Sequence, residues 1–384
     1  MTHPGKITPN RCNLNGSLAS ALPAWGDVDE SRQPVIGVLV GEGIGAEVIA
    51  AACMVLDRMG KKTQGTVDLR FGGKIGLPAK AESGAALSGE VTDFCEAVFS
   101  DGGAILCGPG GGRFVYDLRA HFDLYCKLTP VRHVSAIDDA SIVRPERLDG
   151  VDLVIVRENV GGMYFGCSEM LHGEEREAVQ RFSYTDTQVQ RILRPALELA
   201  RGRRGRLALA LKPDGIPAIS ALWRDNLEQQ ASATDVAWQV LEIDNAAYQL
   251  IANPREFDVI VAPNMFGDVL SDAASLLLGS RGLSFSGNFG PGRRAVYQTG
   301  HGAAYGMAGM NSANPVGQIF SLAMLLRESF GWYREAVAIE TAIATVLGQG
   351  WRTPDMATTL SRVVGTRELG ERIADAAADL LGAP

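Results

Sequence analysis

Two carboxylates spaced four residues apart, Asp268 and Asp272, are the side chains of this 384-residue chain best suited to metal chemistry. They follow the short apolar run 259–262, typical of a buried strand, and an apolar repeat from about Phe266 predicts a helix. Residues i and i+4 share one helix face, where two carboxylates repel each other unless a cation lies between them. Their oxygens suit Mg²⁺ or Mn²⁺. A solvated acidic face is the alternative.

The place of this pair, just past the carboxyl end of a predicted strand, favours a ligand site, because open α/β sheets bind ligands there. Three predicted strands end on polar residues suited to anion or metal chemistry. These residues are Arg157, Lys212 and Asn264. A single Lys or Arg at a strand end is usually a surface residue, but three such ends together suggest a site.

Glycine-rich loops follow two other predicted strands. The apolar run 35–40 precedes a glycine turn at 41–45 and a helix at about 46–59. That order is typical of phosphate cradles, although the spacing is not GxGxxG and a plain tight turn is an equal alternative. The run 104–107 precedes the loop 108–113, whose glycines allow a ligand to approach the backbone closely.

Composition narrows the possible classes of protein. The net charge of −8, from 36 basic and 44 acidic residues, argues against general binding to nucleic acid or an anionic membrane. Six cysteines show no zinc or disulfide spacing, so a cytoplasmic location is expected. No apolar run reaches the roughly 18 residues of a membrane span. Residues 1–34 lack a signal-peptide core, and we expect them to form a flexible extension.

Repeated strand–helix units predict an α/β fold with a mainly parallel sheet. From about residue 35 onward the chain resembles the isopropylmalate, isocitrate and homoisocitrate dehydrogenases, the β-decarboxylating dehydrogenases, as a divergent member. The residues that carry this resemblance are VLVGEGIGAEV, LRAHFDLYCKLTPVR, DLVIVRENVGGMYFG, FDVIVAPNMFGDVLSDAASLL and HGAAYGMAG with SANP.

The resemblance implies two α/β domains around a mainly parallel sheet that is not a standard Rossmann fold. The large cofactor-side domain would combine residues 35–124 with 279–384. Residues 125–278 would form a small domain for dimerisation and for binding metal and substrate.

The resemblance also implies the chemistry, which is NAD(P)-dependent oxidation of a 2-hydroxy acid. Arg119 and Arg157 match arginines that hold substrate carboxylates, for which a planar fork of donors is suited. Lys212 matches the lysine that removes the hydroxyl proton. After hydride transfer and loss of CO₂, Tyr164 would protonate the enol carbon.

Asp244, Asp268 and Asp272 match the metal-binding aspartates of this family, which implies Mg²⁺ or Mn²⁺. Lys212 and Asp244 would reach the site from the second subunit, so a homodimer with shared active sites is implied. A surface lysine and a helix-capping aspartate are the structural alternatives for these two residues.

The substrate side departs from the family pattern. Thr129 stands where the family has a third carboxylate-holding arginine. Losing such a charge-assisted contact weakens binding by roughly 1.5–3 kcal/mol. Either the carboxylate is held differently or the substrate differs. Val115 and Tyr116 match the positions that read the variable substituent, and they argue against a second charged arm. Arg113 is close enough in sequence to weaken that inference.

The cofactor side departs as well. His301 and Gly302 lie in a glycine-rich loop and, with Asn314, match positions on the cofactor side. Asn314 also has a structural explanation as a helix N-cap before Pro at the first helical position. Gly306 replaces the aspartate of NAD-using members, and the Lys-Tyr of NADP-using members is missing. We expect NAD, which has no extra phosphate to neutralise, and NADP is not excluded.

These departures leave three hypotheses. The first is an active enzyme for an isopropylmalate-like 2-hydroxy acid with a non-standard substituent, in specialised metabolism. The second is a non-catalytic or regulatory family member, and the third is oxidation without decarboxylation. The Lys212–Tyr164 pair and all three aspartates remain, while the losses fall on recognition positions, which favours the active enzyme.

Overall fold

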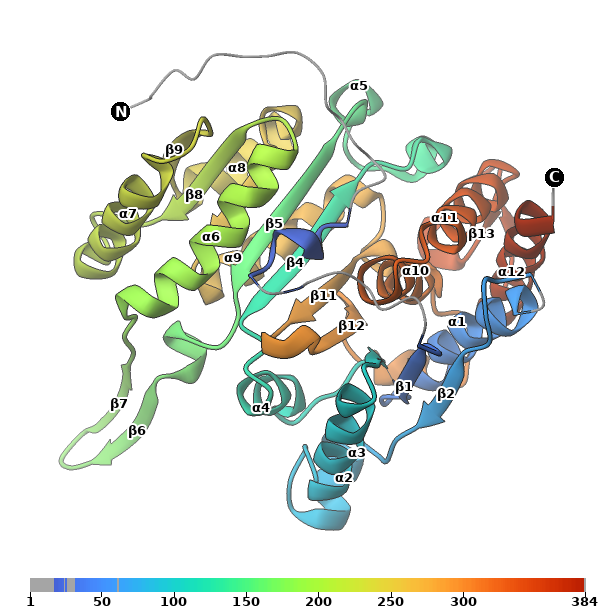
Figure 1. Cartoon of the computed structure of the whole chain (residues 1–384), viewed down its shortest axis with the longest axis horizontal. Helices are drawn as coiled ribbons and strands as arrows, with labels where there is room; N and C mark the ends of the chain where they lie inside the picture. The colour runs from blue at the N-terminus through green and yellow to red at the C-terminus, as the bar shows by residue number, and fades with distance from the viewer. Residues whose placement is uncertain (1–16, 24, 26–31, 61, 383–384) are drawn as a thin grey trace.

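The computed structural model describes residues 17–23, 25, 32–60 and 62–382 (Figure 1). At its centre ten described strands form one sheet in the order β2-β1-β3-β12-β11-β4-β5-β10-β8-β9. These strands are β1 (Val35–Leu39), β2 (Asp68–Phe71), β3 (Ala104–Cys107), β4 (Cys126–Arg132), β5 (Asp152–Glu158), β8 (Arg206–Leu211), β9 (Ala237–Glu242), β10 (Val259–Ala262), β11 (Phe285–Phe289) and β12 (Ala295–Thr299).

Twelve α-helices of the described residues surround the sheet. They are α1 (Gly45–Met59), α2 (Gly76–Ser83), α3 (Gly89–Ser100), α4 (Phe114–His121), α5 (Pro145–Leu148), α6 (Asp186–Gly202), α7 (Pro217–Ala231), α8 (Ile243–Ala252), α9 (Asn264–Ala274), α10 (Val316–Phe330), α11 (Tyr333–Gly348) and α12 (Thr366–Gly382). Among them, none combines the length with the apolar character that a membrane span requires.

The α/β class with a mainly parallel sheet is confirmed. The pairs β11–β12, β11–β4 and β4–β5 are antiparallel, and the other neighbouring strands of the large sheet run parallel. The antiparallel centre distinguishes this sheet from a standard Rossmann fold. Every residue of β1, β3 and β10 is buried, as expected for continuous apolar runs covered on both faces.

The sheet order groups the strands by the chain segments from which they come. Strands of 35–124 and 279–384 form one half, strands of 125–278 form the other, and the halves meet where β11 pairs with β4. In Figure 1, α1, α10, α11 and α12 gather beside the first half, and α6, α7 and α8 beside the second. One hydrophobic core includes residues of both halves, so the two-domain division stays a prediction.

Part of the N-terminal extension packs against the rest of the protein, so the expectation of a flexible segment 1–34 is wrong for these residues. Ala19, Leu22 and Trp25 are buried. The backbone N–H of Ala19 donates to the carboxylate of Glu328 over 2.8 Å, and the indole of Trp25 donates to the Glu328 carbonyl over 3.1 Å. Three apolar residues spaced by three cover core surface here, which the polar composition concealed. Most of the remaining extension lies outside the described residues.

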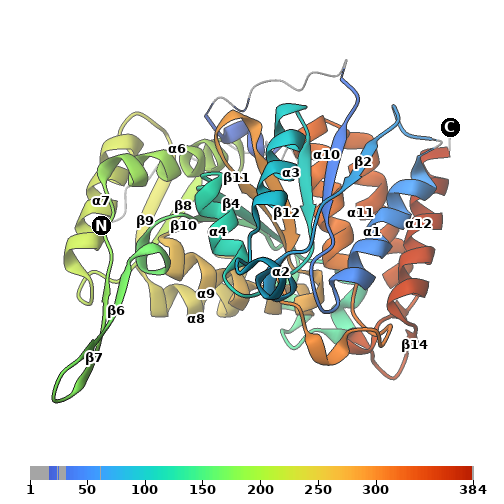
Figure 2. The same ribbon diagram turned by 90° about the horizontal axis from the view of Figure 1, so that it is seen from below.

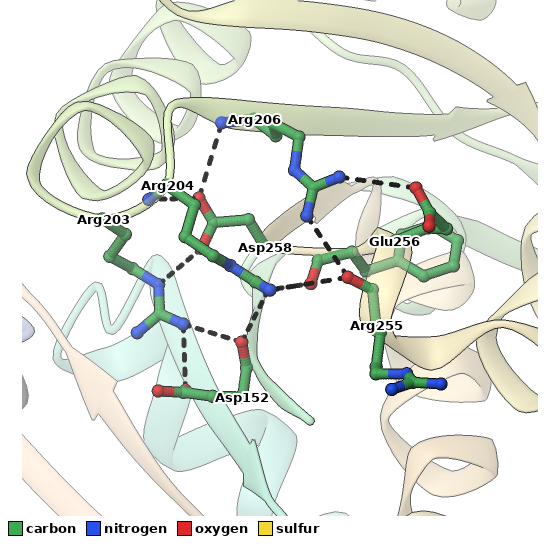
Figure 3. Close-up of polar contacts among 8 residues, drawn as sticks. Asp152, Arg203, Arg204, Arg206, Arg255, Glu256 and Asp258 are labelled. Carbon is green, nitrogen blue, oxygen red and sulfur yellow. Dashed lines mark hydrogen bonds and ion pairs between the residues drawn. The ribbon is translucent and has the colours of Figure 1, made fainter. Parts of the chain in front are cut away.

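An ion-pair network fixes the amino-terminal ends of β5, β8 and β10 (Figure 3). The Asp258 side chain is fully buried, and its carboxylate accepts hydrogen bonds from Arg203 Nε and from the backbone N–H of Arg204, each over 2.8 Å. Arg203 also reaches Asp152 over 2.9 Å. A buried carboxylate needs such partners. The network therefore anchors the sheet edge opposite the strand ends on Arg157 and Lys212.

A two-stranded hairpin, β6 (Cys167–His172) with β7 (Arg176–Arg181), projects away from the body (Figure 2). All residues of β6 are exposed, including the apolar side chains of Met170 and Leu171. Apolar side chains on an extended arm are typical of a surface that another chain covers. A further small sheet pairs β13 (Trp351–Arg352) with β14 (Arg362–Val363).

Candidate active site

A cavity of about 250 Å³ lies at the sheet edge where β3, β5 and β12 end. This is the edge at which open α/β sheets bind ligands. Candidate residues from four separate stretches of chain line it. They are Val115, Tyr116, Arg119, Arg157, Asp268, Asp272, His301 and Gly302.

Arg157, at the end of β5, is locked in place by its neighbours. Its side chain is 1% exposed, and its Nε and Nη2 donate to Oδ1 of Asn264 over 2.9 and 2.8 Å. Its Nη1 donates to the carboxylate of Asp268. Helix α9 approaches so closely that a Cβ on Gly267 would lie 2.8 Å from the Arg157 side chain. The guanidinium is therefore presented to the cavity in one fixed orientation.

Arg119, on α4, lacks comparable partners. It is buried, and its Nε has no hydrogen-bond partner among the described residues. Burial, followed by the charge of Arg157, lowers the pKa of Arg119 to about 9, which leaves it charged at neutral pH. A buried cation without a partner is suited to an anionic ligand.

Asp268 and Tyr164 form a hydrogen-bonded pair beside these arginines. Tyr164 lies in the short helix Gly162–Phe165, and its hydroxyl donates to Oδ2 of Asp268 over 3.0 Å. Burial raises the pKa of Asp268, but nearby cations, Arg157 first, outweigh it and bring the pKa below 3.8. Burial and the negative Asp268 raise the pKa of Tyr164 to about 12. At neutral pH the site therefore holds an ionised carboxylate and a protonated phenol.

The two aspartates fit a divalent cation. Asp272 lies four residues after Asp268 on α9, lines the same cavity and pairs with Arg281 over 2.6 Å. Two carboxylates on one helix face supply the hard oxygen ligands that Mg²⁺ and Mn²⁺ prefer. Within the described residues no group of three His, Cys, Asp or Glu forms a complete site. One chain alone thus offers two of the three expected aspartates.

Lys212 and Asp244 lie outside this cavity. The Lys212 ammonium pairs with Asp244 over 3.1 Å and with Glu242, and it borders a second cavity of about 190 Å³. Side-chain hydrogen bonds to Glu242 and Asp244 raise the pKa of Lys212, so within one chain it is no base. Apolar residues surround it in this second cavity: Met163, Phe182, Ile216, Ile219, Met265 and Phe266. The shared site stays a prediction.

Thr129 does not line the cavity, and its expected contact with substrate stays a prediction. It is 3% exposed, and its hydroxyl has no hydrogen-bond partner in the described part of the chain. The residue of β4 that does line the cavity is Lys127, which sequence reasoning missed. Alternation along a strand was the available signal, because residues 127 and 129 face the same side of a sheet.

Two residues expected on the cofactor side lie outside the cavity. The Asn314 side chain is used internally: its amide donates to Asp355 over 2.9 Å, and its oxygen accepts from the Val316 backbone over 3.0 Å. Helix α10 begins at Val316 with Pro315 as its N-cap, one residue later than predicted. Gly306 is exposed, and a Cβ there would meet no atom within 4 Å.

His301 lies at the cavity with its ring held by the adjoining loop. Its Nδ1 is 3.0 Å from the carbonyl oxygen of Gly302, and its Nε2 is buried without a partner among the described residues. Burial lowers the pKa of His301, so the ring is neutral at pH 7. An unpaired ring nitrogen at a cavity wall is available to a polar ligand.

The glycine turn 41–45 packs against the loop that carries His301. The backbone N–H of Ile44 donates to the carbonyl of Ala303 over 2.9 Å, and the Glu42 carboxylate accepts from the N–H groups of Leu77 and Gly111. Gly43 has a φ of +60°, and a Cβ there would lie 1.9 Å from Ala303 O. The turn thus holds the His301 loop in position, which agrees with the tight-turn interpretation, and the phosphate cradle stays a prediction.

A larger cavity of about 1020 Å³ lies between α6, α10, α11 and the N-terminal segment. It contains none of the candidate residues. Its lining joins apolar side chains to residues of the ion-pair network, such as Asp152, Arg203 and Arg204. The smaller cavity is the better candidate, because fixed cations and carboxylates converge there.

Comparison with known proteins agrees with this architecture. A family model described as isocitrate/isopropylmalate dehydrogenase matches residues 35–373. The 3-isopropylmalate dehydrogenase of Geobacillus kaustophilus is 39% identical over 367 residues, covering 90% of this chain and 95% of that protein. The one of Gloeobacter violaceus is 37% identical, covering 88% and 96%. The isocitrate dehydrogenase structure from Methylococcus capsulatus matches with a TM-score of 0.80 at 29% identity, covering 90% of this chain and 99% of that one.

Proposed function

Because the chain belongs to the isocitrate/isopropylmalate dehydrogenase family, we propose that it is a metal-dependent NAD(P) oxidoreductase that oxidises and decarboxylates a 2-hydroxy acid. The substrate is an isopropylmalate-like acid with a non-standard substituent. One observation carries the proposal: the buried guanidiniums of Arg119 and Arg157 share a cavity with the carboxylates of Asp268 and Asp272.

Each of these residues has a defined task in the proposed reaction. Arg119 and Arg157 bind the substrate carboxylates, and the rigid hold of Asn264 on Arg157 orients the acid. Tyr164 stays protonated up to high pH and supplies the proton to the enol carbon after CO₂ leaves. Its position beside Asp268 keeps the hydroxyl at the cavity.

Asp268 and Asp272, with the partner subunit's Asp244, would hold Mg²⁺ or Mn²⁺. Such a cation, when bound, acidifies the substrate hydroxyl and stabilises the negative charge that develops during decarboxylation. The partner subunit's Lys212 accepts the hydroxyl proton in this proposal. NAD is the proposed hydride acceptor, since Gly306 offers neither a charge nor a donor that would favour the NADP phosphate.

The cavity residues expected to contact the variable substituent of the substrate favour an apolar or aromatic group there. Val115 and Tyr116 line the cavity, and the ring of Tyr116 packs edge-on to that of Tyr164 at 5.5 Å. Arg113 lies with its guanidinium over the Tyr116 ring, near Asp117, and it is not among the lining residues. A second charged arm on the substrate would therefore meet no counter-charge from Arg113.

The proposal includes a homodimer. Lys212 and Asp244 lie outside the cavity within one chain, and a second copy could bring them to it. Exposed apolar side chains on the hairpin and on α8, among them Met170, Leu171 and Tyr248, offer surface for such an interface.

The test is steady-state kinetics with Mn²⁺, NAD or NADP and a panel of acids that includes 3-isopropylmalate, malate and isocitrate. Nicotinamide absorbance reports oxidation, and CO₂ release reports decarboxylation. We expect metal-dependent turnover, with equal amounts of reduced nicotinamide and CO₂. Reduced nicotinamide without CO₂ would establish oxidation alone, and no turnover with any acid would favour a regulatory family member.

A further inference from the structure

Lys127 is a mostly buried lysine to which the proposed reaction assigns no task. It lies on β4 opposite Arg157 of β5, and its side chain is 7% exposed. It lines the candidate cavity, and its ammonium makes no hydrogen bond or ion pair with any residue that the structure describes. The Lys127 ammonium is not among the buried atoms without a partner, so it is open to the cavity. A cation on a mostly buried side chain without an ion pair is unfavourable, and proteins retain one only for a reason.

The cavity around Lys127 is lined by more positively charged than negatively charged side chains. Arg119, Arg157 and Lys127 all line it. Of the two lining carboxylates, Asp268 is engaged by Arg157 and Tyr164, and Asp272 pairs with Arg281. Arg119 and Lys127 thus face the cavity without an ion pair of their own among the described residues, although the charge of Asp268 acts on both. Burial first, then the charges of Arg119 and Arg157, lower the pKa of Lys127 well below 10.5. An anion bound between them reverses that effect.

The geometry of β4 connects Lys127 to the missing arginine. Residues 127 and 129 lie on the same face of the strand, roughly 6–7 Å apart along it. In the pairing of β4 with β5, Thr129 lies opposite Ile155 and is enclosed. Lys127 lies opposite Arg157, at the cavity. On this strand face the cation therefore stands two residues closer to the site than the position at which it was expected.

We propose that Lys127 is a substrate-binding residue that takes the place of the arginine missing at position 129 and, together with Arg119, holds one carboxylate of a dicarboxylic 2-hydroxy acid. This inference rests on the proposed function. An ammonium is a compact point charge with rotatable donors, whereas a guanidinium is a planar fork. A carboxylate bound by Lys127 is therefore not fixed in one plane. The acid can then bind in a rotated orientation, which leaves room for a different substituent.

The experiment compares wild-type protein with Lys127→Met, which keeps the length of the side chain and removes its charge. Lys80→Met is the matched control, because Lys80 is exposed on α2, away from the cavity. For each protein we measure the melting temperature without ligand, its rise with Mn²⁺ and each acid of the panel, and KM and kcat. We expect Lys127→Met to raise KM about tenfold or more, with a smaller effect on kcat and a much smaller thermal shift by the acid.

Without ligand, Lys127→Met should melt at a higher temperature than wild type, because a buried charge without a partner has been removed. A structural lysine predicts the opposite change. An unchanged KM in Lys127→Met, or a lower melting temperature with an unchanged thermal shift by the acids, would overturn the inference.

A second variant keeps the inference falsifiable if Lys127→Met does not fold. Lys127→Arg keeps a cation at this position, and it should bind the acids better than the uncharged Lys127→Gln. Equal binding by these two variants would contradict the proposal. Stabilisation of wild type by an acid without turnover would refute the proposed function only, whereas no stabilisation by any acid would refute both.

Discussion

The hydroxyl of Tyr164 donates a hydrogen bond to Oδ2 of Asp268 over 3.0 Å, which links the candidate proton donor to a candidate metal ligand. Replacing Tyr164 with Phe should leave substrate oxidation possible but remove the proton for the enol carbon. We predict a fall in kcat of roughly 10²-fold or more, since general acid catalysis contributes that much. Rapid-mixing kinetics should still show a first turnover of nicotinamide reduction. Full steady-state activity in Tyr164→Phe would show that another group is the acid.

Asp268→Asn should abolish turnover and weaken Mn²⁺ binding. Arg157 keeps its two hydrogen bonds to Asn264, so the fold should survive the loss of this one partner. Isothermal titration with Mn²⁺ measures the binding, and circular dichroism checks the fold. Asp225→Asn on α7 is the control, because Asp225 is an exposed aspartate outside the cavity. Wild-type activity in EDTA would exclude a metal-dependent mechanism.

Thr129→Arg should impair the enzyme. The side chain at 129 is enclosed, and a guanidinium there would be a further buried cation close to Arg157 and Lys127. An unpaired buried charge costs several kcal/mol, so stability and kcat/KM should both fall. Thermal melting and kcat/KM with 3-isopropylmalate and with the best acid of the panel measure the effect. Improvement with both acids would mean that the pocket is an ordinary one with a weakened hold.

The pKa of His301 makes stability depend on pH. Burial lowers this pKa in the folded protein below the ordinary value of about 6.5, so the unfolded chain binds the proton more readily. The stability that the neutral His301 ring contributes is therefore complete above about pH 6.5. It is lost as the pH falls toward the lower pKa that His301 has in the folded protein. His301→Gln, which cannot be protonated, should flatten stability across that interval in urea unfolding. An unchanged slope in the variant would contradict a buried neutral imidazole.

Much of the fold was predictable because its strands are continuous apolar runs. The runs that became β1, β3, β5, β8 and β10 are covered on both faces, so their apolar character alone marks them. The family resemblance was confirmed over residues 35–373. The packing of Ala19, Leu22 and Trp25 was not predictable, since these few apolar residues lie in a polar stretch and their partner, Glu328, is distant in the chain.

The site was predictable where a motif fixes a residue, and less so where packing decides. Arg119, Arg157 and Asp268 converge as their motifs implied. The roles of Thr129 and Asn314 depended on position-by-position comparison, which does not show that one side chain is enclosed and the other is already hydrogen-bonded. Lys127 lay inside a recognised motif, and only strand pairing shows that it reaches the cavity.

The central claim is that the cavity of one chain, with Asp268 and Asp272, is completed by the partner subunit's Lys212 and Asp244. Asp268→Asn and Lys212→Met should each be inactive alone. In a mixed dimer of the two, one site carries both changes and the other carries neither.

The most direct measurement is the activity of the two variants after they are unfolded together and refolded as a mixture. Random pairing should restore about a quarter of wild-type turnover, because half of the dimers are mixed and each has one intact site. Each variant refolded alone is the control and should stay inactive. A mixture that remains inactive although mixed dimers form would contradict a site shared between two chains.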